Sequence, residues 1–175
     1  MSLAPLETPL EKDSLIEADN WNRIENLELL ISRAIDTAHA YAEQVEKIEI
    51  RQGSEVSLVF SDNETVRELN AAHRGKDQPT NVLSFPIDEE ADPLGPLLGD
   101  IVFAYETVER EAEELAIEFS AHLTHLCVHG FLHLLGYDHI EWDEAEKMEA
   151  VEIAILAQLG IDNPYAGSDP LPMPD

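Results

Sequence analysis

Apolar residues recur every three to four positions in several stretches of the chain, the period of a helix that buries one face. The first stretch follows Asp19 and Asn20, either of which suits a helix N-cap. Its apolar positions are Ile24, Leu27, Leu30, Ile31, Ala34 and Ala38. We expect further helices over residues 61–73, 107–118, 119–135 and 142–159. Ser61 and Glu64 stand at the spacing of a capping box, so the helix over 61–73 should begin there.

Shorter apolar runs between these helices predict strands. Residues 47–51 and 56–60 lie on either side of a turn at Gly53, which predicts a hairpin. Two more strands are expected over residues 81–85 and 100–105. Because the strands fall in the first two-thirds of the chain and helices at both ends, we predict an α+β fold. Its small mixed four-stranded sheet should be packed with about five helices.

The chain has 175 residues, enough for one domain with a substantial core, which we expect over residues 19–161. Residues 1–18 are rich in Pro, Glu and Asp and predict a flexible acidic N-terminal extension. Residues 162–175 are rich in Pro and Asp and predict a flexible tail. The helix over 119–135 is apolar nearly all round apart from its histidines, so it should be the central buried helix.

The chain is strongly acidic, with a formal net charge of −27. Taken alone, this charge opposes nonspecific binding to nucleic acid or to an anionic membrane. One cationic cluster, Arg67, Arg74 and Lys76, falls within ten residues. The single cysteine, Cys127, excludes an intrachain disulfide and suits a reducing cytoplasm. Since no signal peptide is evident and no apolar run approaches ~18 residues, we expect a cytoplasmic protein without a membrane partner.

Three histidines follow the spacing H-x3-H-x5-H from His129 to His139. On a helix, His129 and His133 lie within ~40° of the same face and ~6 Å apart along the axis, so both imidazoles can reach one ion. Gly136 can take the left-handed conformation that ends a helix, which lets His139 approach from the side. Three neutral nitrogen ligands leave the fourth position of a tetrahedral Zn²⁺ open for water, as in catalytic sites. We therefore expect one zinc ion per chain.

The same spacing is similar to the metzincin protease signature H-E-x-x-H-x-x-G-x-x-H, which indicates a zincin-like central helix. Where that signature has the glutamate that acts as general base, this chain has Gly130. His125 is ~12 Å of helix rise from His133, too far for both to bind one ion. We interpret His125 as a residue that supports the ligands or faces the substrate. His39 and His122 are interpreted as surface or packing residues.

A second motif, Arg74-Gly-Lys-Asp-Gln-Pro-Thr-Asn-Val-Leu-Ser-Phe-Pro86, places two cations beside a glycine and ahead of an apolar strand. Arg74 and Lys76 offer donors to an anionic substrate, and an ordinary helix–loop–strand connection has the same composition. Together with Leu98-Gly-Asp-Ile101 and the histidine motif, this segment resembles the YbeY family. Members of that family are bacterial ribosomal-RNA maturation factors regarded as single-strand endoribonucleases. The resemblance covers about residues 45–160.

The resemblance implies a zinc-bound α+β domain with His129, His133 and His139 as ligands. It also implies a part in RNA handling for Arg74, with Lys76 in support. His125 matches a histidine commonly found upstream of the triad, and we expect it to serve catalysis with Arg74. The implied reaction is cleavage of single-stranded RNA during 3′-end maturation of small-subunit ribosomal RNA and in ribosome quality control. The implied partners are this RNA and the small ribosomal subunit or its proteins, and no DNA is expected.

Two other functions fit the same residues. The first is a metallohydrolase of peptide or small-molecule substrates, which the histidine spacing supports and Gly130 weakens. The second is a ribosome-assembly factor whose metal is structural, and the net charge favours its docking to a basic protein. The general base stays open, since Asp138 and Glu141 are both close to the last ligand. Asn81 stands where many relatives carry aspartate, so this chain has no carboxylate at that position.

Overall fold

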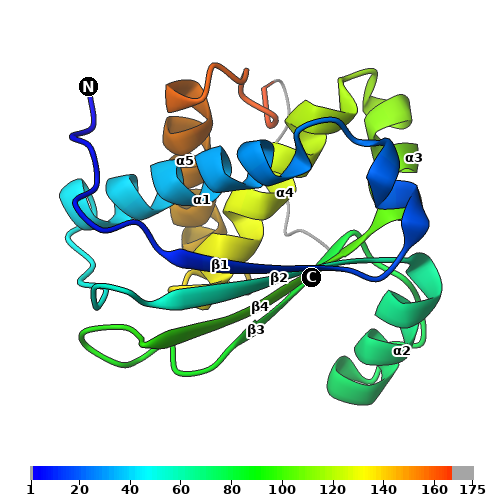
Figure 1. Cartoon of the computed structure of the whole chain (residues 1–175), viewed down its shortest axis with the longest axis horizontal. Coiled ribbons are helices and arrows are strands. Elements are labelled where there is room, and N and C mark those ends of the chain that lie inside the picture. Colours follow the sequence, from blue (N-terminus) through cyan, green and yellow to red (C-terminus); the bar gives the residue numbers. More distant parts are fainter. Residues whose placement is uncertain (1, 167–175) are drawn as a thin grey trace.

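A four-stranded mixed sheet organises the molecule (Figure 1). The computed structural model describes residues 2–166. Its strands are β1 (Glu11–Ile16), β2 (Glu55–Ser61), β3 (Val82–Pro86) and β4 (Leu97–Ala104). They lie in the order β1-β2-β4-β3, with β1, β2 and β4 parallel and β3 antiparallel to β4. The predicted α+β class with a four-stranded mixed sheet is confirmed.

Helices cover the two faces of this sheet unequally. Within the described residues they are α1 (Leu27–Gln44), α2 (Asn63–Arg74), α3 (Tyr105–Leu115), α4 (Phe119–Leu134) and α5 (Trp142–Gln158), with a short 3₁₀ helix at Asp19–Arg23. Helices α1 and α4 lie on one face with α5 packed against them, and α2 lies on the opposite face (Figure 1). Leu58 and Ile101 belong to the large core under α1 and α4, whereas Leu83 and Val102 pack with Val66 of α2.

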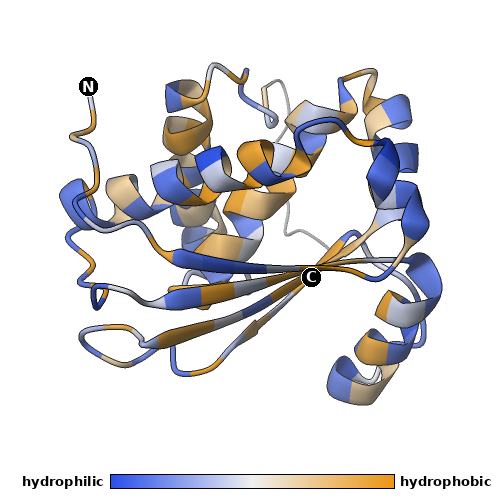
Figure 2. Ribbon diagram, viewed as in Figure 1, coloured by the Kyte–Doolittle hydropathy of each residue, from blue (hydrophilic) through white to orange (hydrophobic). Residues whose placement is uncertain are grey.

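Helix α4 is the central helix, as the sequence predicts, and Figure 2 shows it as largely apolar. Every residue from His122 to Leu132 is buried. The helix approaches the sheet closely at Gly130, where an added Cβ would lie 2.9 Å from the Cγ2 atom of Ile101. Its histidines are therefore held in a packed environment. No helix in residues 2–166 has the length and apolarity needed to cross a membrane.

The expectation of a flexible extension over residues 1–18 is wrong for the strand β1, which pairs with β2 along its whole length. Leu10, just before the strand, is buried, and Lys12 forms an ion pair with Asp36 of α1 at 2.7 Å. Most side chains of β1 are exposed, and this edge strand is held mainly by main-chain hydrogen bonds to β2. Because the sequence of β1 is polar and lacks apolar alternation, its pattern did not predict a strand.

The predicted hairpin is also wrong. Residues 55–61 do form β2, but this strand pairs in parallel with β1 and β4. In the other stretch, Lys47 has a φ of 59°, which interrupts an extended run, and Ile50 makes one isolated bridge with Leu94. Gly53 does form a turn, with a φ of 74°. The turn at Gly53 was predicted correctly, but residues 47–51 before it do not form a strand.

Part of the predicted tail, residues 167–175, lies outside the described residues. Residues 162–166 are described, and among them Tyr165 packs against the central helix. Its ring centroid lies 5.4 Å from that of His125, and its hydroxyl donates to a carboxylate oxygen of Glu152 at 2.7 Å. The packed part of the chain thus extends past the expected boundary at residue 161.

Candidate metal centre

The three histidines of the motif converge, although they come from a helix and from the loop that follows it. His129 and His133 lie one turn apart on α4, and His139 lies in the loop before α5. One potential ligand atom from each lies within 4.8 Å of the other two. The ring centroids are 4.6 Å apart for the helical pair, and His139 lies 4.9 Å from His133 and 5.5 Å from His129. These three side chains can hold one metal ion.

Hydrogen bonds on the far sides of the two helical rings assign their tautomers. His129 Nδ1 lies 3.1 Å from a carboxylate oxygen of Glu152, and His133 Nδ1 lies 2.9 Å from the carbonyl oxygen of Tyr137. Each acceptor requires a hydrogen on Nδ1, so each Nε2 presents a lone pair. The two Nε2 atoms are 3.1 Å apart, and two nitrogens on one tetrahedral zinc lie about 3.3 Å apart. Facing lone pairs at this distance repel each other unless a cation lies between them.

The protonation of His133 also suits a ligand. Burial lowers its pKa from the ordinary value of 6.5 to about 3, helped by the charges of His129 and His139. An imidazole must be neutral to bind a metal. His133 is therefore ready to bind at neutral pH without first losing a proton.

The loop that delivers His139 begins at Gly136, whose φ of 102° confirms the predicted positive-φ helix end. The N–H of Gly136 donates to the carbonyl of His133 at 3.1 Å, so the helix closes directly after the second ligand. Asp138 does not project into the site as a free base. Its carboxylate accepts the main-chain N–H of His139 at 2.8 Å and so stabilises the turn that carries the third ligand.

Glu152 of α5 is a residue of this site that the sequence reasoning missed. It is fully buried, and both of its carboxylate oxygens are used. One oxygen accepts from His129, while the other lies 2.7 Å from His125 Nε2 and from the hydroxyl of Tyr165. Burial alone would raise the pKa of Glu152, but the hydrogen bonds from His125 and His129 hold it well below its usual range. A carboxylate that fixes the tautomer and orientation of a ligand is typical of protein metal sites.

A second carboxylate, Glu149, lies one turn before Glu152 and borders a small void together with His129 and His139. Its Oε2 atom is buried and has no hydrogen-bond partner among the described residues. Burial raises the pKa of Glu149, and the negative charge of Glu152 raises it further. Asp138 and Glu141, the two carboxylates left open as general base, are nearer to His139 along the chain.

Gly130, where the protease signature has its glutamate, faces the sheet. An added Cβ would lie 2.9 Å from Ile101 and 3.1 Å from the hydroxyl oxygen of Ser84. That hydroxyl donates to the carbonyl of Gly130 at 3.1 Å, so β3 is bonded directly to the metal-binding helix. A larger side chain at this position would separate helix and strand. The absence of the protease base is therefore tied to close helix–sheet packing.

Arg74 lies close to this packed strand but is itself exposed. It is the last residue of α2, which Gly75 ends with a φ of 70°. The helix is capped by Asp62, whose carboxylate accepts the N–H of Thr65, one residue later than the predicted cap. The guanidinium of Arg74 donates to the carbonyl of Ser84 at 3.0 Å.

A chain of contacts thus runs from Arg74 through Ser84 to Gly130, the residue after the first ligand. Lys76 is exposed in the loop that follows α2. The third member of the predicted cationic cluster, Arg67, is turned to Asp77, with 2.7 Å between nitrogen and oxygen. The structure therefore connects Arg74 to the metal-binding helix, and Arg67 makes a local ion pair.

Two of the remaining histidines, His39 and His122, are packed away from the group of three. His39 is buried on α1 and pairs with Glu43 at 3.0 Å. His122 is buried on α4, and its Nε2 lies 2.9 Å from Glu111 of α3. Both are packing residues, as the sequence analysis interpreted them.

His125 does not belong to the group of three histidines, but it lies close to that group. Its ring centroid is 6.4 Å from that of His129, and it shares Glu152 with that ligand without belonging to the group of three. It also borders a cleft beside the metal centre. His125 therefore lies between the carboxylate that holds His129 and the cleft, and its role stays a prediction.

Fold and site together define an α+β domain in which the central buried helix and the loop after it bring together three histidines that could hold a metal ion. Comparison with known families is specific: the family described as Endoribonuclease YbeY matches residues 16–160. The chain therefore belongs to the YbeY family, and the resemblance read from its motifs is confirmed.

The relatives span nearly the whole chain. A protein of Agrobacterium fabrum named Endoribonuclease YbeY is 51% identical over 159 residues, which cover 89% of this chain and 95% of the relative. One of Rhizobium meliloti with the same name is 48% identical over 170 residues, or 93% and 99% of the two chains. A solution structure from Thermotoga maritima has a TM-score of 0.49 and 26% identity, with 91% of this chain and 97% of that chain covered.

Proposed function

We propose that this protein is a zinc-dependent endoribonuclease that cleaves single-stranded RNA during maturation of the 3′ end of small-subunit ribosomal RNA and in ribosome quality control. The observation that carries the proposal is the convergence of His129, His133 and His139 in a chain whose relatives are named endoribonucleases. Its expected place is the cytoplasm, with the small ribosomal subunit or its proteins as partners.

Zinc suits the donor set. Three neutral imidazoles are ligands that zinc accepts, and a site with three protein ligands keeps a fourth position open for water or substrate. When bound, the ion would bring the pKa of a water toward ~7 and stabilise charge that develops on the phosphodiester. Glu152 and the carbonyl of Tyr137 hold the two helical imidazoles so that both Nε2 atoms face the same point.

The phosphate of the substrate is assigned to Arg74, with Lys76 in support. A guanidinium carries five N–H donors in a planar fork that matches phosphate oxygens, so the contact with Ser84 is compatible with holding a phosphate. Ser84, whose carbonyl accepts from this arginine, is itself bonded to Gly130 of the metal-binding helix. His125 is assigned to catalysis, since it contacts Glu152 on one side and borders the cleft on the other.

Cleavage of a labelled single-stranded RNA by rigorously nuclease-free preparations tests the proposal. The wild type should cut the RNA, a chelator should abolish cutting, and added zinc should restore it. His139→Ala should be inactive, and its circular-dichroism spectrum should match that of the wild type. A substrate with a 2′-deoxy group at the cleavage position would then show whether the adjacent 2′-hydroxyl is the nucleophile.

Persistent cleavage by His139→Ala would assign the activity to a contaminant and contradict the proposal. If no preparation cut RNA but the protein co-sedimented with small ribosomal subunits, an assembly role with a structural metal would replace it. Chelator-sensitive cleavage of peptides that disappeared in His133→Ala would instead favour a peptidase.

A further inference from the structure

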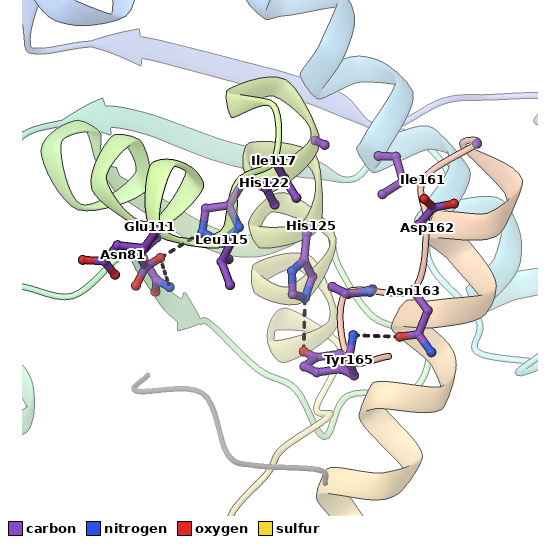
Figure 3. A pocket seen from close by; sticks show the side chains of 14 residues that line it. Asn81, Glu111, Leu115, Ile117, His122, His125, Ile161, Asp162, Asn163 and Tyr165 are labelled. Atoms are coloured by element: carbon purple, nitrogen blue, oxygen red, sulfur yellow. Dashed lines mark hydrogen bonds and ion pairs between the residues drawn. The ribbon is translucent and has the colours of Figure 1, made fainter. Parts of the chain in front are cut away.

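A cleft of about 650 Å³ opens beside the metal centre, in the size range of ligand sites, about 300–1,000 Å³. Its floor is the N-terminal half of α4, with His122 and His125 (Figure 3). One wall comes from α3 and the residues after it, and the other comes from the segment after α5. Figure 3 shows Glu111 and Leu115 on the first wall, with Ile161 on the second. Of the described residues that line this cleft, His125 and Tyr165 contact Glu152 of the metal centre, and His122 pairs with Glu111.

The charge of the cleft opposes a phosphate. Glu111, Glu114 and Asp162 line it, and no Lys or Arg is among the described residues that do. An anionic group placed here would lie against carboxylates without a compensating cation. The cleft is therefore suited to a neutral or cationic part of a ligand.

The walls of the cleft suit a flat heterocycle. Leu115 and Ile117 line it although they are 58% and 42% exposed, so their apolar surface is available to a ligand. Rings are also present, since His125 and Tyr165 border the same space. Single-stranded RNA is commonly recognised through bases that unstack and lie on aromatic or histidine rings and apolar side chains.

A hydrogen-bond acceptor is held in place at one wall. Glu111 receives Asn81 Nδ2 at 2.9 Å and His122 Nε2 at 2.9 Å, and both bonds go to its Oε1 atom. Neither of these two bonds uses its second oxygen, Oε2. A carboxylate fixed in this way can accept an N–H from the edge of a nucleobase.

The position of the cleft relates it to cleavage. His125 on its floor contacts Glu152, which in turn contacts the ligand His129, and the rings of the two histidines are 6.4 Å apart. A phosphodiester at the metal centre would place the neighbouring base near this opening.

We infer that the cleft binds one nucleobase of the RNA, next to the phosphate that is cut. The inference rests on the proposed endoribonuclease function. It divides the substrate between two surfaces: phosphate at the metal centre and Arg74, and uncharged base between α3 and the segment after α5. An acidic protein can thereby bind RNA locally without an extended basic face.

Nuclear magnetic resonance of the metal-loaded full chain tests this with two ligands that carry the same phosphate, cytidine 5′-monophosphate and ribose 5-phosphate. The reporter is the methyl signals of Ile161, which lines the cleft. The nucleotide should shift these signals, and ribose 5-phosphate should not. In Leu115→Ser/Ile117→Ser the affinity for the nucleotide should fall roughly tenfold, since apolar and stacking contacts to a base contribute on that scale.

The matched control is Leu15→Ser/Leu29→Ser, which removes two leucines, each 55% exposed, that do not line the cleft. Its affinity for the nucleotide should equal that of the wild type. Equal shifts from both ligands, or an equal loss of affinity in the two double variants, would overturn the inference. Shifts from a lysine-rich peptide but none from the nucleotide would make the cleft a protein-docking site and also overturn it.

Cleavage of RNA by the wild type, measured in parallel, distinguishes failure of the base site from failure of the endoribonuclease function. Normal cleavage with no nucleotide-induced shift rejects the base site and leaves the endoribonuclease function intact. Absence of cleavage removes the function itself, and the inference about the base falls with it.

Discussion

The metal centre and the Arg74 segment are both candidate parts of one site, yet they are built differently. Around the metal centre, His129 is 1% exposed and its partner Glu152 is fully buried. Arg74 is exposed at the end of α2, and its guanidinium meets the carbonyl of Ser84. One region is fixed before any ligand arrives. The other is a long side chain at a surface.

This difference matches two separate tasks. A metal ligand must be held within a few tenths of an ångström, which buried second partners achieve. A phosphate-binding arginine acts through charge and through a planar fork that can adapt to its ligand. Variants of the metal centre should therefore change metal content and cleavage together, and variants of Arg74 should change only the handling of RNA.

The largest effect is expected from removal of two metal ligands. The double variant His133→Ala/His139→Ala should lose the bound divalent metal, because one imidazole cannot retain it, and RNA cleavage should be lost as well. Elemental analysis of protein purified without added metal measures the content, which should be close to one zinc per wild-type chain. Metal content equal to that of the wild type would remove these histidines from the site.

A smaller effect is expected at the carboxylate behind the first ligand. Glu152→Gln keeps the shape of the side chain but removes the charge that His129 and His125 face, so zinc affinity should fall roughly 10–100-fold. Competition with a chromophoric chelator measures this affinity without any RNA. The control is Glu146→Gln, the same change at an exposed position of α5, which should bind zinc as the wild type does. If both variants bound zinc equally well, Glu152 would be only a packing residue.

The contrast between Glu152 and the histidines also shows what the sequence can predict. The triad was predictable because all its members lie within eleven residues, where helix geometry and one glycine determine the arrangement. Glu152 was not, since it is one of several glutamates on α5 and only the packing of α5 on α4 selects it. Tyr165 was missed for the same reason, in a segment interpreted as flexible.

The strands show the same limit: the sequence predicted those that their own residues define and missed the one that pairing defines. Apolar runs close to β3 and β4 were recognised because buried strands need apolar side chains. The edge strand β1 has mostly exposed residues, so nothing in its pattern separated it from an irregular segment. The run over residues 47–51 alternates like a strand, yet it makes only the bridge of Ile50. Local pattern therefore predicted strands with buried side chains, including the edge strand β3, better than the exposed strand β1, which is defined by its pairing with β2.

The Arg74 segment gives the next prediction. Arg74→Ala should weaken RNA binding roughly tenfold, the scale of a lost charged hydrogen bond, while zinc content and thermal stability stay close to those of the wild type. Arg74→Lys should restore binding only in part, because an ammonium cannot reproduce a two-pronged contact. Arg33→Ala removes the same charge from an exposed position on α1 and serves as the control for net charge. Equal RNA binding and cleavage in all four proteins would exclude Arg74 from the site.

The smallest effect concerns Asn81, at the buried end of the same segment. Its side-chain N–H donates to Glu111, and burial alone would raise the pKa of Glu111, whereas hydrogen bonds from His122 and Asn81 lower it. This lowered pKa stabilises the fold above the unfolded pKa of about 4.3, and the contribution is lost as pH falls through the folded value. Asn81→Asp sets two carboxylates against each other, so it should cost about 1–2 kcal/mol at pH 7.

The pH dependence of that cost separates repulsion from a simple packing defect. Below about pH 5 one of the two carboxyl groups in Asn81→Asp takes up a proton and can donate to the other, so the deficit in Tm relative to wild type should narrow. The double variant Asn81→Asp/Glu111→Gln exchanges donor and acceptor, because the new amide can donate to the aspartate while its oxygen still accepts from His122. It should recover most of the lost Tm at pH 7. A deficit that is the same at pH 4 and pH 7, and that the double variant does not repair, would show that the contact between α3 and the residue before β3 depends on shape and not on charge.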